Sequence, residues 1–262
     1  MRSERARTVT VGAVFNPSGR RGPRVAIDFS RIDRRLEVAP FTPTRAELVA
    51  NAQLYPERIV RAPLSDADRQ AGFTAGRIVA LDLRLENSGR SQIDSLDVQL
   101  DWRLDGPAGS EVRLSAAGTW QPRFRTRRSP LEPGFDRIGL ADGPLRTRGN
   151  VGAEWSRGAT TVGLNVQYHS GYLATYSDPS RVRLNPQIVR FQGTDRIPAQ
   201  AYVDLAVSRL LRVGGGQAEL GLGISNLLDA SPPIVAQSGA PGYSLYGDPR
   251  RRRLDVTLVS RF

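Results

Sequence analysis

The chain has 262 residues, a formal net charge of +11 and no cysteine, and all of its basic residues other than His169 are arginine. The absence of cysteine excludes disulfides, thiolate nucleophiles and cysteine-ligated metal sites, and no apolar run is long enough for a transmembrane helix. The charge permits a surface that binds polyanions, but the arginines are scattered among acidic residues. A genome rich in G and C also encodes arginine in place of lysine, which explains the composition without a polyanion.

From the first residues onward, apolar and polar residues alternate with a period of two, which predicts strands with one apolar and one polar face. Residues 40–76 form a long segment of mixed pattern, and Ala46–Leu54 within it is expected to form a short helix. The first strands are expected at Thr8–Phe15, Arg24–Val38, Ile78–Leu104 with a kink at 87–89, and Glu111–Gln121.

The connections between the expected strands alternate between short turns and long loops. The strands of a soluble β-sandwich also alternate apolar and polar residues, but such a fold would not usually have a loop of about twenty-five residues at every second connection. Short turns at one rim and long loops at the other are typical of an outer-membrane barrel. The sequence therefore predicts an all-β fold, an antiparallel transmembrane β-barrel whose apolar face meets lipid. Its later strands are expected at Arg148–Ser156, Thr160–His169, Ala201–Arg212, Gln217–Leu227 and Leu254–Phe262.

Aromatic residues on the apolar faces favour the same interpretation. Two aromatic belts on the outer face are typical of a protein that meets both interfaces of a bilayer, whereas the alternative is ordinary core packing. The belt beside the short turns is expected to contain Phe15, Trp102, Trp155 and Phe262, and the belt beside the long loops Trp120 and Tyr168.

No group of residues predicts catalysis, a metal site or a cofactor, so we expect the chain not to be an enzyme. His169 is the single histidine and has no partner for a metal site, so it is expected to be a polar residue of the rim or lumen. Gly214–Gly216 is better explained as a turn than as a phosphate loop. Asp97 and Asp101 are better explained as a polar wall than as catalytic carboxylates. Arg250–Arg253 indicates a loop that re-enters the membrane boundary, or a site for phosphate or lipopolysaccharide.

Several stretches resemble the C-terminal barrel portion of TonB-dependent outer-membrane receptors. A four-residue motif after one strand resembles the Asn-Leu-Phe-Asp box of this family. Residues 199–207 and 246–262 resemble the strand before the box and the closing strand, and residues 86–97 are similar to an earlier strand of the family. Two departures are Ser260, where the family often has an aromatic residue, and Arg209, an arginine on an apolar face. The motif consists of Asn226, Leu227, Leu228 and Asp229.

The resemblance implies that residues 1–262 are the C-terminal part of a barrel of about twenty-two strands, with about nine present and with the plug domain and signal peptide absent from the chain as given. It implies no cofactor. It also implies a location in the outer membrane of a Gram-negative bacterium, contact with outer-membrane lipid, and recognition of the C-terminal strand by the barrel-assembly machinery. The TonB complex would be reached only through the missing N-terminal part. Such receptors bind a scarce siderophore, cobalamin or oligosaccharide ligand and import it, and this portion is not expected to function alone.

The sequence does not name the ligand, but aromatic residues of two long loops are candidates for binding it. Their rings can stack on a ligand or pack within the loops, and the sequence does not decide between the two. One alternative function is a porin-like barrel, which would need a tenth strand within Pro40–Gly76 because bacterial barrels have even strand numbers. A less favoured alternative is a soluble nucleic-acid-binding β protein, since no nucleic-acid motif is present. The loop candidates are Tyr172, Tyr176, Phe191, Tyr243 and Tyr246.

Overall fold

The computed structural model describes residues 2–17, 22–39, 41, 43–129, 133–174, 186–213, 216–236 and 242–261. Tyr176 and Phe262, which the sequence singled out, lie outside the described residues. None of the helices within these ranges combines the length and the apolar character needed to cross a bilayer.

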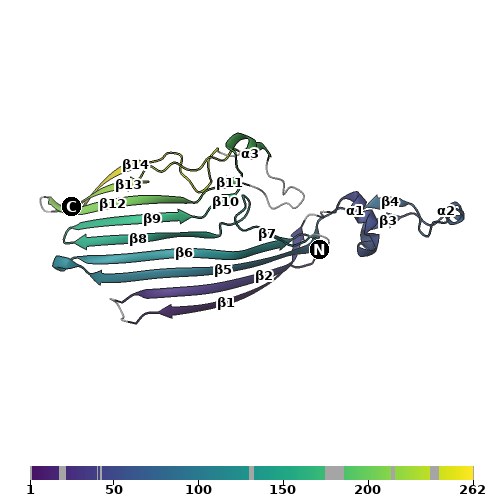
Figure 1. The fold of residues 1–262 in the computed structure, drawn as a ribbon. Helices are drawn as coiled ribbons and strands as arrows, with labels where there is room; N and C mark the ends of the chain where they lie inside the picture. Colours follow the sequence, from purple (N-terminus) through teal and green to yellow (C-terminus); the bar gives the residue numbers. More distant parts are fainter. Residues whose placement is uncertain are drawn as a thin grey trace. The chain divides into compact units, whose positions relative to one another are not determined.

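The long strands form one large sheet, in which they follow one another in chain order (Figure 1). The pairs whose register is defined, from β6 to β14, are all antiparallel. This confirms the predicted all-β antiparallel fold, and in this order the strands β1 and β14 each have a single neighbour. The strands are β1 (Arg5–Phe15), β2 (Arg24–Ala39), β5 (Glu86–Asp105), β6 (Glu111–Arg127), β8 (Thr147–Arg157), β9 (Thr160–His169), β12 (Gln200–Val213), β13 (Gly216–Ser225) and β14 (Arg253–Arg261), with the short β7 (Phe135–Asp136) beside β6.

One predicted strand has to be corrected. Ile78–Leu104 is not continuous: β4 (Ile78–Leu81) pairs with β3 (Ile59–Arg61) in a separate two-stranded sheet, and the long strand begins at Glu86. Between the two strands, the carbonyl oxygens of Asp82 and Arg84 accept from the Arg58 guanidinium at 3.1 Å and 2.9 Å, so they are bonded outside the ladder of the large sheet. Within the described residues of Pro40–Gly76, no strand extends the large sheet, so the tenth strand that a porin-like barrel would need is not found there.

The expected helix at Ala46–Leu54 is shorter in the structure. It is α1 (Arg45–Ala50), which begins at a capping box formed by Thr44 and Glu47 and is followed by the 3-10 turn η1 (Ala52–Leu54). The remaining elements also belong to connections between long strands. They are η2 (Pro56–Arg58), α2 (Asp66–Gln70), η3 (Pro107–Gly109), β10 (Tyr172–Leu173), α3 (Pro186–Gln192) and β11 (Arg196–Ile197), with β10 paired to β11.

Cross-strand register keeps the two faces of the sheet chemically distinct. Val151 lies opposite Ala116 on β6 and Val166 on β9, whereas its neighbour Asn150 lies opposite Gln167. A slip of one residue would move every apolar side chain to the other face. The alternation in the sequence therefore fixes the register as well as the strands.

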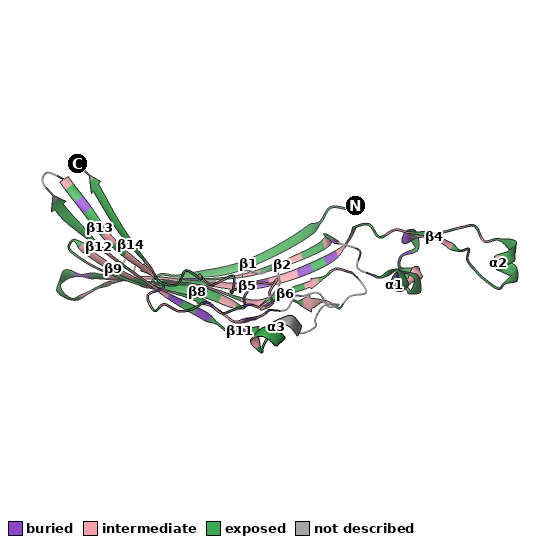
Figure 2. Ribbon diagram, turned by 90° about the horizontal axis from the view of Figure 1, so that it is seen from above, coloured by how far each residue is buried: buried purple, intermediate pink, exposed green. Residues whose placement is uncertain are grey.

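The apolar face of the sheet is exposed. The exposed fraction is 60% for Val151 and 74% for Val256, and Figure 2 shows exposed residues along β1, β13 and β14. No second layer of the described chain covers these residues. Because exposed apolar surface costs about 25 cal/mol per Å² in water, a face of this extent requires an apolar environment.

The residues expected in the two aromatic belts have different exposures. Trp102 is half-buried, and the other described members are exposed on the sheet. Their contact with membrane interfaces stays a prediction. The exposed members are Phe15 and Trp155 beside short turns, and Trp120 and Tyr168 beside long connections.

The residues form two compact units. One consists of Met1–Arg7, Asp33–Gln92 and Thr126–Phe135, and the other of Thr8–Ile32, Ile93–Arg125 and Asp136–Phe262. In the second unit, the short turns lie at one end of the strands and the long connections at the other, as the sequence predicts (Figure 1).

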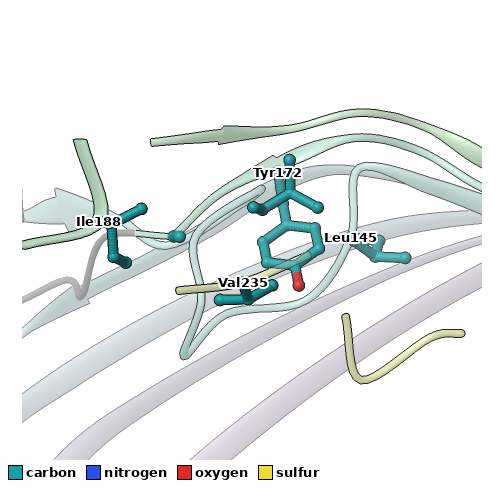
Figure 3. Close-up of a cluster of buried hydrophobic side chains, with 6 residues drawn as sticks. Leu145, Tyr172, Ile188 and Val235 are labelled. Carbon is teal, nitrogen blue, oxygen red and sulfur yellow. The ribbon is translucent and has the colours of Figure 1, made fainter. Parts of the chain in front are cut away.

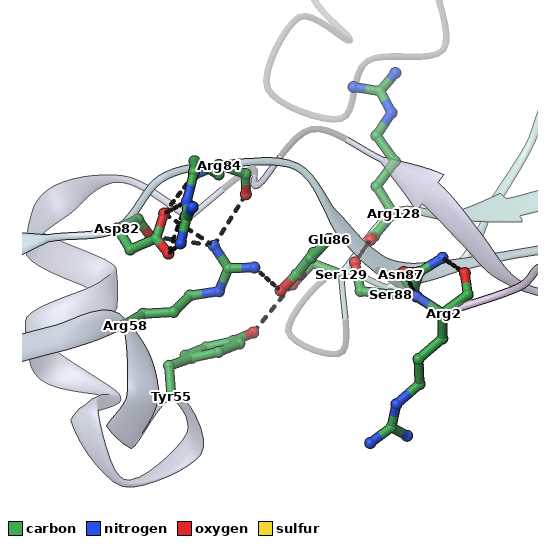
Figure 4. A network of polar contacts seen from close by, with 10 residues as sticks. All are labelled: Arg2, Tyr55, Arg58, Asp82, Arg84, Glu86, Asn87, Ser88, Arg128 and Ser129. Atoms are coloured by element: carbon green, nitrogen blue, oxygen red, sulfur yellow. Dashed lines mark hydrogen bonds and ion pairs between the residues drawn. The ribbon is translucent and has the colours of Figure 1, made fainter.

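The first unit is organised around the buried guanidinium of Arg58 (Figure 4). Besides the two carbonyl contacts, it pairs with the carboxylate of Glu86 at 2.9 Å and lies 4.4 Å from the centre of the Phe41 ring. Tyr55 packs edge-on against Phe41, and its hydroxyl lies 3.3 Å from that of Ser129. The ion pair therefore joins the long connection to the beginning of β5.

Arg58→Ala should open the segment 43–85. The substitution leaves the Glu86 carboxylate buried without its partner, which typically costs about 3–5 kcal/mol. Hydrogen exchange measured peptide by peptide should show faster exchange in this segment. Arg69→Ala removes an exposed ion pair to Asp66 and serves as the control, so equal effects of the two substitutions would contradict the role given to Arg58.

Candidate functional site

A groove of about 440 Å³ lies on the polar face of the second unit, over β5, β6, β8 and β9. Small residues, among them Ala117 and Gly149, leave it hollow, and longer polar side chains surround it. The polar residues that line the groove are Asp97, Gln99, Thr119, Arg148, Asn150, Asn165, Gln167 and His169.

Two cross-strand rows build the groove. Arg148 lies between Thr119 on β6 and His169 on β9, and in the next row Asn150 lies between Ala117 and Gln167. Neighbouring strands are about 4.8 Å apart, so each row spans about 10 Å. Residues that are distant in sequence are thereby placed within reach of one small molecule.

The two carboxylates nearest the rows already accept hydrogen bonds. The hydroxyl of Thr119 donates to Asp97 at 2.6 Å, and the side-chain amide of Gln167 donates to Asp204 at 3.0 Å. In contrast, no carboxylate among the described residues pairs with the exposed guanidinium of Arg148. As far as the described residues go, the groove therefore offers a guanidinium without a carboxylate partner and several amide groups.

His169 lies at the wall of the groove, and its position is fixed by an aromatic neighbour. Its ring stacks on that of Tyr246, with the ring centres 5.3 Å apart and the planes at 27°. Within the described structure, its Nδ1 atom is buried and has no hydrogen-bond partner. Burial raises the pKa of the Tyr246 phenol above its ordinary value, so this ring meets the histidine as a neutral aromatic.

The loop aromatics proposed as ligand contacts divide into buried and exposed residues. Tyr172 is buried, and Tyr246 packs on it with the ring centres 5.8 Å apart. Phe191 and Tyr243 are exposed, and Tyr176 lies outside the described residues. Tyr172 and Tyr246 hold the long connections together. Ligand binding by any of the loop aromatics stays a prediction. The buried cluster around Tyr172 contains Leu145, Ala174, Ile188, Ile197 and Val235 (Figure 3).

A chain of buried polar contacts ties these connections to β12. The Tyr172 hydroxyl donates to that of Ser244 at 3.2 Å, and the Gln200 side-chain amide donates to the same hydroxyl at 2.7 Å. The Tyr202 hydroxyl donates to the side-chain oxygen Oε1 of Gln200 at 3.0 Å. Residues from two long connections are therefore joined to the wall of the sheet beside His169.

The motif Asn226–Asp229 closes the turn after β13. Asn226 and Asp229 both have a φ of 53°, a left-handed conformation that Asn and Asp tolerate better than most residues. The Asn226 side chain bonds both backbone groups of Ala230 at 2.9 Å, and its backbone N–H donates to Asp204 at 2.8 Å. Asp229 accepts the backbone N–H of Arg252 at 3.0 Å. The motif thus connects β12, β13 and the beginning of β14.

Two aspartates partly neutralise the arginine run before β14. Asp248 pairs with Arg250 at 2.8 Å, and Asp229 pairs with Arg251 at 3.1 Å. Hydrogen bonds from the side chain and backbone of Arg250 lower the pKa of Asp248 to about 2, with a smaller effect of Arg253. These ion pairs favour the interpretation of Arg250–Arg253 as a loop that returns to the sheet, rather than as an open site for phosphate.

The described residues contain no cluster of histidine, cysteine and acidic side chains that would hold a metal ion. Among the residues of the groove, Arg148, Asn150 and Gln167 were not identified from the sequence. The sequence does contain a signal for them, because all three occupy polar positions in the alternating pattern of β8 and β9. Recognising them requires the register that places the two strands side by side.

Comparison with known proteins gives a likeness in structure alone. No protein-family model and no curated protein sequence matches the chain. The solved structures that share its fold include those of two receptors and a transporter. A mutant of the ferric enterobactin receptor PfeA from Pseudomonas aeruginosa has a TM-score of 0.53 at 14% identity and covers 98% of this chain. The ferric-catecholate import receptor Fiu from E. coli has a TM-score of 0.56 at 14% identity, and the unliganded ferric citrate transporter FecA has 0.54 at 15% identity, each again over 98% of this chain.

This chain spans 31% of the PfeA chain, 28% of Fiu and 31% of FecA. The resemblance to TonB-dependent receptors is thereby confirmed at the level of the fold.

Ile188→Ala should loosen the packing of the long connections. Ile188 has an exposed fraction of 0%, and truncation of a buried isoleucine typically costs about 2–5 kcal/mol. Limited proteolysis should cleave residues 186–197 faster in the variant. Phe191→Ala on the same helix is the control, because Phe191 is 68% exposed. Faster cleavage in this control as well would argue against the buried cluster as the anchor.

Proposed function

We propose that the chain is the C-terminal barrel segment of an outer-membrane active-transport receptor. In this proposal the receptor binds a scarce ligand of the siderophore, cobalamin or oligosaccharide class and imports it with TonB-coupled energy. No bond in the ligand changes. The TonB complex acts through the N-terminal part of such a receptor, and the barrel-assembly machinery recognises the C-terminal strand.

The observation that carries the proposal is the chemical difference between the two faces of the sheet. The apolar face exposes residues such as Val151 and Val256 without a covering layer in the described chain, and the polar face carries the groove. A bilayer on one side and a water-filled lumen on the other satisfy both faces at once. The likeness in fold to three receptors and transporters supports the same arrangement.

The groove and the long connections have complementary parts in this function. The connections that pack around Tyr172 would form the mouth of the barrel, and Phe191 and Tyr243 are exposed there for a first contact with the ligand. The groove lies on the wall beside them, where Arg148 and the amide groups face the lumen. A ligand captured by the connections would reach these polar groups next.

Two adjacent alanines of β6 test the orientation of the sheet. Ala116 lies opposite Val151 on the apolar face, and Ala117 lies opposite Asn150 on the polar face. The chain has no cysteine, so Ala116→Cys and Ala117→Cys each introduce a single thiol with little change in volume. In outer membranes of cells that express the segment as part of a complete receptor, a charged, membrane-impermeant thiol reagent should label only the cysteine at position 117.

The expected contrast is at least about tenfold in labelling rate, because a charged reagent is strongly disfavoured in hydrocarbon. Denaturation of the membranes in detergent should abolish the difference and shows that both thiols are reactive. Equal labelling at the two positions in intact membranes would refute the membrane orientation and, with it, the proposed function.

A further inference from the structure

The groove contains three kinds of polar group in a fixed order. Arg148 and Asn150 lie on β8, Gln167 lies on β9 to one side of them, and Asp97 and Gln99 lie on β5 to the other side, beyond Thr119 on β6. Arg148 and Asp97 are therefore separated by about two strand spacings, or about 10 Å. Such a separation permits one small molecule to meet both charges at different ends.

Each group selects a different part of a ligand. A guanidinium binds a carboxylate through two parallel N–H···O bonds, and Arg148 has no competing carboxylate partner among the described residues. Amide side chains both donate and accept hydrogen bonds, as hydroxyl groups do. Asp97 accepts the Thr119 hydroxyl at 2.6 Å and, as a carboxylate, can accept further donors. It repels a second anion.

We propose that the groove binds a small polyhydroxylated molecule with a single carboxylate, the chemistry of a sugar acid. Arg148 holds the carboxylate, the amide side chains bond the hydroxyl groups, and Asp97 accepts hydroxyl donors at the far end. The proposal deepens the proposed function and rests on it, because the polar face must be open to water for a ligand to enter.

Competing ligand chemistries fit the groove less well. A neutral polyol satisfies the amides but leaves Arg148 without an anion. A dicarboxylate of the same length satisfies Arg148 but places its second charge near Asp97. The His169 ring is held in its stack by Tyr246, so the groove wall adjoining Arg148 is fixed before the ligand arrives.

Protection of a single cysteine from labelling tests the proposal in membranes. Ala117→Cys places the reporter thiol in the lining of the groove without removing a polar group. The probes are gluconate, sorbitol and glucarate, which share a six-carbon hydroxylated chain and carry one, no and two carboxylates. Gluconate should slow the labelling at the lowest concentration, and sorbitol and glucarate should each need a concentration about tenfold higher, as expected for one lost or opposed charged contact.

Two substitutions assign the effect to the named residues. Arg148→Gln should raise the half-protecting concentration of gluconate about tenfold or more and leave that of sorbitol unchanged. Arg146→Gln is the matched control, because Arg146 is an exposed arginine immediately before β8 and does not line the groove. Asp97→Asn should improve protection by glucarate.

The outcomes separate this inference from the function on which it rests. Equal labelling of Ala116→Cys and Ala117→Cys removes the membrane orientation and both proposals. Selective labelling at position 117 with no protection by gluconate, with better protection by glucarate or sorbitol, or with the same effect of Arg148→Gln and Arg146→Gln overturns the ligand assignment alone.

Discussion

The structure depends on one geometric constraint of the extended chain: successive side chains point to opposite faces of a sheet. Asn150 and Val151 illustrate it, since one lines a polar groove and the other is exposed on the apolar face. Hydrogen bonding between antiparallel neighbours keeps this division across the strands, because most polar residues lie opposite polar or small ones and most apolar residues lie opposite apolar or small ones. In the proposed receptor, the same register would give a barrel wall with one face for lipid and one for water.

The long connections follow a different physical rule. They cannot rely on a regular hydrogen-bond ladder, so they are held by local cores and buried polar contacts. In one unit Arg58 satisfies two backbone carbonyls and the carboxylate of Glu86. In the other, Tyr172 and Tyr246 pack together, and the hydroxyl of Ser244 links the connections to β12. Within each unit, these contacts turn a long connection into a structured element.

The sequence predicted the large sheet well because a period of two is a local property. Most long strands lie near the bounds expected from the sequence, although β6 continues to Arg127, beyond the expected end at Gln121. The prediction failed at Ile78–Leu81, where alternation is present but the pairing partner is β3. β3 and β4 pair although they are distant in the sequence, and no local pattern reveals such a partner. The groove was missed for the same reason, since Arg148 and His169 become neighbours only through the register of β8 and β9.

The order of the strands has a consequence for how proteins with this wall can diverge. Each long connection leaves one strand and returns to its hydrogen-bonded neighbour, so both of its anchor points are already close together. The entropy of closing such a loop grows only with the logarithm of its length. Insertions and deletions in these segments therefore cost the large sheet little free energy. Recognition can evolve through changes in the length of the connections while the antiparallel sheet stays unchanged.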